Sequence, residues 1–357
     1  MIAPRHWGRL AGLGWDIARS NVPGRRFAPY RITLILNGRC NCRCTMCDIW
    51  QKKPAAEMTF HEIDRFFERN RRFSWINLSG GEIFLRPDLE EILALILERC
   101  RRLFLLDFPT TGQTPERIES IVAATLKKRR PPRWYVTVSL DGPPEVHDRV
   151  RGREGAFERA VETYRRLWKL RDAGFRPFFG YTLQAANEGR LEEALAALRR
   201  AVPGLTADDL HVNYAHVSPH YYGNDASALP HAERALGELE AVTEQRTGHW
   251  HPVAYLERRY QKLLRRYLDS GRTPLPCAAL TASCFISDDW TVHPCSIDGR
   301  VLGNLRDHDF DLETLWRSRD DLQELRDGIR RGECPNCWTP CEAYQTILGS
   351  LARRSTG

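Results

Sequence analysis

Short apolar segments alternate along the chain with longer segments in which apolar residues recur at helical spacing. The short segments predict strands at residues 32–36, 75–78, 103–108, 134–140, 177–183 and 210–214. The longer ones predict helices at about residues 59–70, 88–100, 115–128, 155–172 and 188–201. This alternation favours a parallel sheet built from βα units. Asn187 is expected to cap the last helix, because its side chain can bond the free amide groups there.

A cluster of cysteines follows the first predicted strand. Cys40, Cys44 and Cys47 stand at the spacing C-x3-C-x2-C. Three thiolates on one short loop can hold three corners of a four-iron cluster and leave the fourth iron free. An open coordination site is typical of a catalytic metal centre. A zinc site and a chance group of reduced thiols are the alternatives. Cys42 lies at the wrong spacing for a ligand and is expected to pack inward.

Two further motifs extend this pattern into a family resemblance. Gly80-Gly81-Glu82 follows the second predicted strand, and Ser139-Leu140-Asp141-Gly142 closes the fourth. With the cysteine loop, these motifs make the chain resemble the radical S-adenosylmethionine enzymes. The resemblance implies the α/β class, with a partial (β/α)6 TIM-like barrel over residues 30–225. The functional loops of such a barrel lie at the carboxyl ends of its strands.

The resemblance also implies a cofactor and its chemistry. A [4Fe-4S] cluster on the three cysteines would bind S-adenosyl-L-methionine and cleave it reductively to a 5′-deoxyadenosyl radical, which abstracts a hydrogen atom from the substrate. A flavodoxin or ferredoxin would supply the electron. The expected S-adenosylmethionine-binding residues are Ile49, Gly80, Gly81, Glu82, Thr111, Ser139, Asp141, Arg151 and Asn187. Asp141 also fits a turn residue, and Arg151 also fits a surface ion pair.

The last quarter of the chain carries a second group of cysteines. These are Cys277, Cys284, Cys295, Cys334, Cys337 and Cys341. Residues 285–295 predict a hairpin. Residues 274–357 resemble the twitch or SPASM extension, a small Cys-rich α+β domain that carries auxiliary clusters. Six thiolates cannot fully ligate two cubanes, so one auxiliary [4Fe-4S] cluster is expected.

The ligands expected for the auxiliary cluster are Cys277, Cys295, Cys334 and Cys337. Cys341 is the first substitute and Cys284 the next. A zinc site with four cysteine ligands is the alternative, because tetrahedral thiolate geometry also suits zinc.

Composition narrows the class of protein. The chain has 357 residues, of which 42% are hydrophobic and 28% are charged, as in ordinary soluble proteins. Eleven cysteines cannot all pair, and their clustering favours metal binding in a reducing, cytoplasmic compartment. The net charge of +7 is spread along the chain, which argues against a nucleic-acid groove. No segment approaches the roughly 20 apolar residues that span a bilayer.

The N-terminal residues 1–29 form a basic amphipathic segment. Trp7, Leu10 and Ile17 can share one helical face, and arginines lie around it. We expect this face to pack against the bottom or an edge of the barrel. The alternative is peripheral contact of residues 1–22 with an anionic membrane surface. Residues 226–273 are expected to be a helical bridge to the C-terminal domain.

The substrate is indicated only weakly. His216, Tyr221 and Tyr222 follow the sixth predicted strand and are expected to meet it. The expected reaction oxidises or rearranges a small molecule such as a sugar, cyclitol or lipid precursor. Modification of a ribosomally synthesised peptide or protein is the alternative, although residues 1–29 look too short for a peptide-docking domain. A non-catalytic iron–sulfur electron-transfer protein is disfavoured by the motifs at residues 80–82 and 139–142.

Overall fold

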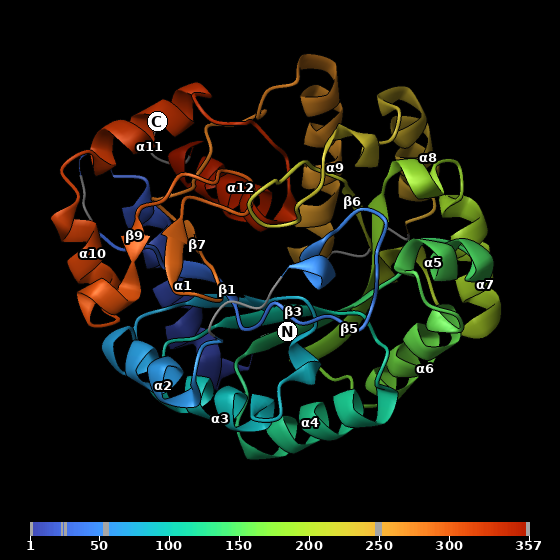
Figure 1. The fold of residues 1–357 in the computed structure, drawn as a ribbon, viewed down its shortest axis with the longest axis horizontal. Helices are drawn as coiled ribbons and strands as arrows, with labels where there is room; N and C mark the ends of the chain where they lie inside the picture. The colour runs from blue at the N-terminus through green and yellow to red at the C-terminus, as the bar shows by residue number, and fades with distance from the viewer. Residues whose placement is uncertain (1–2, 23, 25–26, 53–56, 247–251, 355–357) are drawn as a thin grey trace.

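The computed structural model describes residues 3–22, 24, 27–52, 57–246 and 252–354 (Figure 1). Its centre is a parallel sheet whose first six strands pair in chain order. They are β1 (Arg31–Ile35), β2 (Trp75–Ser79), β3 (Leu105–Thr110), β4 (Arg133–Ser139), β5 (Phe175–Leu183) and β6 (Leu210–Tyr214). The structure therefore confirms all six predicted strands and the α/β class.

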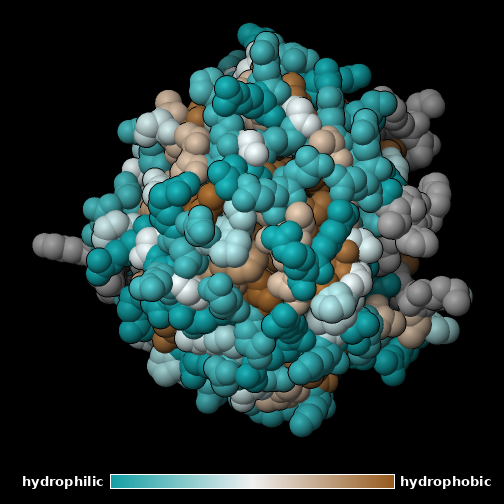
Figure 2. All heavy atoms as spheres, turned by 90° about the vertical axis from the view of Figure 1, so that its right-hand side faces the viewer, coloured by the Kyte–Doolittle hydropathy of each residue, from teal (hydrophilic) through white to brown (hydrophobic). Residues whose placement is uncertain are grey.

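Helices cover the outer face of this sheet (Figure 1). The five predicted helices are α2 (Phe60–Arg69), α3 (Leu89–Arg99), α4 (Pro115–Lys128), α6 (Ala156–Lys169) and α7 (Leu191–Ala201). Helix α2 begins at a capping box in which Thr59 and Glu62 bond each other's backbone amides. Figure 2 shows that the flank carrying α5–α8 is mostly hydrophilic, as solvent-facing helices require.

The helices on the outer face of the sheet differ from the prediction in two ways. Helix α5 (Pro144–Arg151) was not predicted, although Pro144 at its start and Gly152 just past its end are helix signals. The predicted cap at Asn187 is wrong. Helix α7 starts later, with Arg190 at the capping position, because a 3₁₀ turn over residues 185–187 and Gly189 at φ +78° intervene.

The two faces of the strands differ in polarity. In β4, Trp134, Val136 and Val138 are buried in the core beneath the helices. The alternating residues Tyr135 and Thr137 are partly exposed on the opposite face, which is the barrel interior. The interior face of β4 therefore carries polar side chains that are partly exposed.

The C-terminal region continues the barrel sheet instead of forming a separate one. β7 (Ser283–Ile286) pairs in parallel with β1, and β8 (Thr291–His293) and β9 (Gly303–Asn304) add antiparallel strands beyond it. The predicted hairpin is confirmed as β7 and β8. Because β7 extends the barrel, the cysteines around it are fixed relative to the cluster loop that follows β1.

Helices close the open side of the barrel, between β6 and β7. The predicted bridge contains α8 (Ala232–Glu244) and α9 (Pro252–Ser270). The C-terminal helices are α10 (Leu312–Ser318), α11 (Leu322–Arg331) and α12 (Pro340–Arg354). Helix α12 packs against α9 and lies between β7 and β6 (Figure 1). No described helix is long and apolar enough to cross a membrane.

Helix α1 (Trp7–Ser20) covers the end of the barrel where the strands begin. Leu13 joins a small core with Tyr30, Phe104 and Ala282, and Ile17 packs beside it. Asp16 is buried and accepts a hydrogen bond from Ser74. Packing on the barrel is therefore confirmed for the helix and for Ile17.

The same prediction is wrong for two residues of α1. Trp7 and Leu10 are 63% and 41% exposed. Burial of Asp16 sets the rotation of the helix, and that rotation turns both side chains outward.

Candidate functional site

The loop after β1 carries Cys40, Cys44 and Cys47 and is held by backbone hydrogen bonds to distant segments. The amides of Arg43 and Thr45 donate to the carbonyls of Arg151 and Val150, at 2.8 and 2.9 Å. A Cβ at Gly152 would lie only 2.6 Å from the carbonyl oxygen of Arg43, and φ there is +58°. The end of α5 can approach the loop because residue 152 is glycine.

The three thiols differ in their surroundings. A hydrogen bond from Cys42 and the nearby positive charge of Arg151 lower the pKa of Cys44 to about 6, although burial opposes them. Nη1 of Arg151 lies 3.6 Å from Cys44 Sγ. Burial raises the pKa values of Cys40 and Cys47 to about 11 and 12. Cys42 is buried, as expected.

Three thiols on one loop match the ligand number of a cubane with one open iron. No three His, Cys, Asp or Glu side chains in the described residues converge on one point as the ligands of one metal ion do. In a cubane each thiolate binds a different iron, so its ligands stand apart. The guanidinium of Arg151 beside the loop also suits an anionic cluster. The expected ligand set therefore fits this group.

Gly80 and Gly81 bring the loop after β2 against the cluster loop. The amides of Gly81 and Glu82 donate to the carbonyls of Asn37 and Arg39, at 3.0 and 2.8 Å. A Cβ at Gly81 would lie 2.2 Å from the Arg39 oxygen. A side chain at this position would therefore force the two loops apart.

We expect Gly81→Ala to weaken S-adenosylmethionine binding. Overpacking of this kind costs about 1–3 kcal/mol, so Kd should rise by roughly tenfold. Equilibrium binding to the iron-loaded protein measures this effect. Gly237→Ala on α8 is the control, because no atom lies within 4 Å of its Cβ position. Equal affinity in both variants would contradict the close approach as a binding determinant.

Glu82 ties the loop after β2 to the end of β3. Its Oε2 accepts from Thr110 Oγ1 and from the amide and hydroxyl of Thr111, at 2.9, 2.5 and 2.6 Å. Its Oε1 accepts from the Phe84 amide. Burial raises the pKa of this carboxyl, and the hydrogen bonds oppose that shift. Both carboxylate oxygens are thus engaged, and Glu82 acts as a positioning residue for the loops.

Asp141, Arg151 and Asn187 form a second connection beneath the cluster loop. Arg151 Nη2 pairs with Asp141 Oδ2 at 2.5 Å, and both residues are buried. Burial raises the pKa of the Asp141 carboxyl, while the charge of Arg151 lowers it. Asn187 Nδ2 donates to the carbonyls of Asp141 and Thr182, at 3.0 and 2.9 Å. The ion pair of Arg151 is therefore buried, and the surface alternative is excluded.

Two expected cofactor contacts remain at the rim of this site. Ile49 is buried in the turn that follows the cluster loop. Ser139 ends β4 and is partly exposed. Both stay predictions.

The structure brings four of the C-terminal cysteines into one neighbourhood. Cys277 precedes β7, Cys295 follows β8, and Cys334 and Cys337 lie between α11 and α12. Burial raises the pKa of Cys277 far above its usual value, and the charges of Glu342, Cys337 and Cys334 add to the shift. Burial also raises the pKa of Cys295 far above its usual value, and negative charge on Cys337 or Cys277 adds to that shift.

The pKa values of Cys341 and Cys284 are raised by burial and respond to Arg31. The charge of Arg31 lowers the pKa of Cys341, and Glu342 and Asp107 raise it. Glu342 raises the pKa of Cys284, and Arg31 lowers it. Glu342 also acts on the pKa values of Cys277 and Cys295, whereas Arg31 is not among the main influences on those two thiols.

His216 differs from its expected role. It is buried, its Nε2 accepts from the Trp338 amide at 2.9 Å, and its Nδ1 lies 2.8 Å from the Tyr214 carbonyl oxygen. Burial lowers its pKa to about 4, so the ring is neutral. His216 holds the loop that carries Cys334 and Cys337, and the predicted substrate contact is wrong because both ring nitrogens are engaged.

Tyr221 and Tyr222 lie against the loops of the site. The Tyr221 hydroxyl is 3.2 Å from Ser79 Oγ and 3.3 Å from the Gly80 carbonyl oxygen. The Tyr222 carbonyl accepts from the Asp48 amide at 2.7 Å. Burial raises the pKa values of both tyrosines, and negative charge on Cys47 or Cys341 would raise them further. Their contact with substrate stays a prediction.

The sequence did not predict the cluster of polar residues inside the barrel. The Arg31 guanidinium lies over the Trp75 ring, 4.8 Å from its centroid, and 3.9 Å from Glu342. Trp75 Nε1 and Asn77 Nδ2 donate to Asp107. Polar residues at alternate positions of the predicted strands were the available signal.

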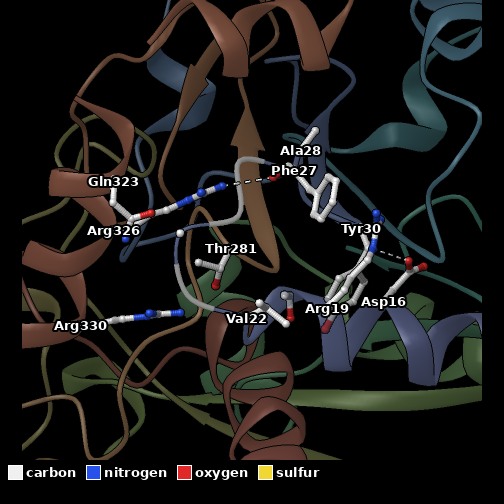
Figure 3. A pocket seen from close by; sticks show the side chains of 12 residues that line it. Asp16, Arg19, Val22, Phe27, Ala28, Tyr30, Thr281, Gln323, Arg326 and Arg330 are labelled. Atoms are coloured by element: carbon white, nitrogen blue, oxygen red, sulfur yellow. Dashed lines mark hydrogen bonds and ion pairs between the residues drawn. The ribbon is translucent and has the colours of Figure 1, made fainter. Parts of the chain in front are cut away.

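The pocket in Figure 3 lies at the opposite end of the barrel from the cysteine loops. Its lining comes from the end of α1, the segment between α1 and β1, Thr281 and α11, with Asp16, Tyr30 and Arg326 among the residues shown. It is therefore separate from the site formed by the cysteine loops.

Comparison with known proteins agrees with this site. The chain is 27% identical to an AdoMet-dependent heme synthase of Methanosarcina barkeri, over 91% of this chain and 92% of that protein. It is 25% identical to a pre-heme d1 synthase of Dinoroseobacter shibae, over 89% and 80%. The fold matches Streptococcus suis SuiB bound to the precursor peptide SuiA, with a TM-score of 0.57, 14% identity and coverage of 90% and 70%.

Two family matches cover both groups of cysteines. Residues 34–198 match the Radical SAM superfamily, and residues 277–342 match the SPASM iron-sulfur cluster-binding domain. The first range contains Cys40, Cys44 and Cys47, and the second begins at Cys277. The chain therefore contains a radical SAM domain, with an S-adenosylmethionine-binding [4Fe-4S] cluster, and a C-terminal SPASM domain for auxiliary iron–sulfur clusters.

Proposed function

We propose that this protein oxidises a small organic molecule held in the polar barrel interior, between the two groups of cysteines. The observation that carries the proposal is the set of interior polar residues Arg31, Asn77, Asp107 and Glu342, because polar groups are costly to place inside a barrel. When bound, the reduced cluster and S-adenosylmethionine supply a 5′-deoxyadenosyl radical that removes a hydrogen atom from the substrate, and an auxiliary cluster supplies an acceptor for the remaining electron.

The chain's own residues orient these groups. Arg151 places a positive charge beside Cys44 and is held there by Asp141. Glu82 fixes the glycine loop that contacts the cluster loop. Tyr221 and Tyr222 cover the same loops and limit the access of water to the reaction. Burial raises the pKa values of the Asp107 and Glu342 carboxyls, and the positive charge of Arg31 opposes both shifts.

The substrate class we favour is a tetrapyrrole. Both relatives named above that match over most of this chain are synthases of tetrapyrroles by name. Arg31 could orient a carboxylate side chain of such a ring in the interior. This choice replaces the sugar, cyclitol and lipid precursors as the leading small molecules.

Peptide modification is the second candidate. SuiB, whose fold matches this chain, binds the precursor peptide SuiA. A subtilosin biosynthesis protein, AlbA of Bacillus subtilis, is 31% identical over 39% of this chain. That match is partial, whereas the synthases match nearly throughout, and the small-molecule proposal is therefore preferred.

Anaerobic reconstitution followed by a substrate screen tests the proposal. The iron-loaded protein is supplied with S-adenosylmethionine and reduced flavodoxin, and 5′-deoxyadenosine and substrate masses are measured. The panel contains iron coproporphyrin III and other tetrapyrrole carboxylates, sugars, cyclitols and precursor peptides. We expect a tetrapyrrole to raise 5′-deoxyadenosine release and to lose hydrogen. Conversion of peptides alone would overturn the small-molecule assignment.

A further inference from the structure

Helix α1 reverses the usual pattern of a surface helix. Its charged residues Arg9, Asp16 and Arg19 are buried or half-buried. All of its exposed positions are apolar: Trp7, Gly8, Leu10, Ala11, Gly14, Trp15 and Ala18. Surface helices normally present charged side chains to water. An apolar outward face therefore indicates a partner that covers it.

Four large side chains make up this outer stripe of α1. They are Trp7, Leu10 and Trp15 on the helix and Val22 just past its end, which are 63%, 41%, 67% and 45% exposed. Trp7, Leu10 and Trp15 lie on the exposed side of the helix. The opposite side is anchored by Leu13 and Asp16, so the stripe cannot turn inward without breaking that packing. The stripe is thus a fixed feature of the surface.

Arginines gather at this end of the barrel. They stand in the loops that lead into β2, β3 and β4, at the barrel end that α1 covers. These residues, the basic collar, are Arg71, Arg72, Arg101, Arg102, Arg129 and Arg130. The Arg102 guanidinium lies 3.5 Å from the Cβ position of Gly12, and Arg9 Nη1 donates to the Leu103 carbonyl at 3.4 Å.

Positive charges of the basic collar change the pKa values of residues at the start of α1. The pKa of His6 is lowered by burial and then by positive charges that include Arg130. Burial lowers the pKa of Arg9, and the positive charge of Arg129 lowers it further.

Part of the collar is not neutralised. Arg71 pairs with Glu68 at 3.8 Å, Arg102 with Asp16 at 3.7 Å, and Arg130 with Asp172. Within the described residues, Arg72, Arg101 and Arg129 have no carboxylate at ion-pair distance. Arg330 adds a further positive charge in the pocket at the end of α1 (Figure 3).

We propose that the outer stripe of α1 and the basic collar dock this protein on an anionic membrane surface. Tryptophans on a helix that lies in the interface bury their rings among the lipid headgroups, and surrounding arginines attract the anionic lipids. A second copy of the chain fits this face less well, because two-fold symmetry would bring the two basic collars together. The proposal is independent of the substrate.

Docking through α1 sets the orientation of the enzyme. Helix α1 covers the end of the barrel where the strands begin, and the cysteine loops lie at the other end. The docked protein therefore presents the mouth of its active site away from the membrane, toward water-soluble substrates and reductases.

Co-sedimentation of the iron-loaded protein with vesicles tests the proposal. Vesicles of phosphatidylglycerol and phosphatidylcholine should bind it, those of phosphatidylcholine alone should not, and salt should weaken binding. Trp7→Ser with Trp15→Ser should abolish binding. The triple variant Arg72→Gln, Arg101→Gln and Arg129→Gln should raise the lipid concentration needed for half-binding by roughly tenfold to a hundredfold.

Matched controls separate docking from general charge and from folding. Val301→Ser removes an apolar side chain that is 58% exposed in the C-terminal domain. The triple variant Arg234→Gln, Arg317→Gln and Arg331→Gln removes the same number of charges elsewhere on the surface. Both controls should bind like the unaltered chain, and all variants should keep their Tm, because the changed side chains are exposed.

Two outcomes would overturn the proposal. The first is absence of vesicle binding by the unaltered chain. The second is a dimer, seen by sedimentation, that Trp7→Ser with Trp15→Ser dissociates; it would identify the stripe as an interface between copies of the chain.

Discussion

Replacing Cys44 with Ala is expected to abolish reductive cleavage of S-adenosylmethionine. Cys44 is the most buried of the three loop thiols proposed as ligands, and Arg151 lies beside its sulfur. Without this anchor one iron loses its thiolate, and the cluster is expected to fall apart. Release of 5′-deoxyadenosine with dithionite, measured without substrate, should drop to the level of a protein-free control. Full activity in this variant would refute the proposed ligand.

The controls for this experiment come from the other cysteines. Cys100→Ala removes a buried thiol at the end of α3, far along the chain from both cysteine groups, and should leave cleavage unchanged. Cys334→Ala should leave slow cleavage measurable while product formation fails, because only the second electron acceptor is affected. Equal loss of cleavage in Cys44→Ala and Cys334→Ala would instead make the auxiliary site structural.

The second large effect concerns iron content. Two cubanes predict about eight iron and eight sulfide per chain. Changing Cys40, Cys44 and Cys47 together to Ala should leave about four irons. Cys277→Ala and Cys337→Ala should each also leave about four, because both thiols lie in the four-cysteine group.

Cys341→Ala is the discriminating variant. Its thiol lies beside Arg31 and Asp107, so iron content should stay at about eight. Loss of half the iron in this variant would make Cys341 an auxiliary ligand. Zinc in place of half the iron, in protein purified without oxygen, would show the C-terminal site to be a zinc site.

The sequence was most informative where a local pattern determines the structure. Apolar segments located all six strands, since a parallel strand buried beneath helices must be apolar. The glycines at 80 and 81 indicated a close approach of two backbones, which the Arg39 carbonyl explains. The spacing of Cys40, Cys44 and Cys47 placed all three on one loop.

The remaining differences depend on contacts between distant segments. His216 lies next to a strand that faces the site, and only the fold shows that it bonds the Trp338 amide. The rotation of α1 depends on Asp16 meeting Ser74 across the barrel end, which no helical periodicity reveals. Cys341 and Cys337 are close in sequence, yet Arg31 from the barrel acts on the pKa of Cys341 and is not among the main causes of the raised pKa of Cys337.

The pairing of β7 with β1 has a consequence for synthesis of the chain. Strand β1 is made early, and one of its edges stays unpaired until Ser283–Ile286 has left the ribosome. An exposed edge can pair with other chains, and contacts this distant in sequence form slowly. The unfinished protein is therefore exposed to aggregation throughout translation of the barrel, and iron delivered before release of the C-terminus would meet only one of the two cysteine groups.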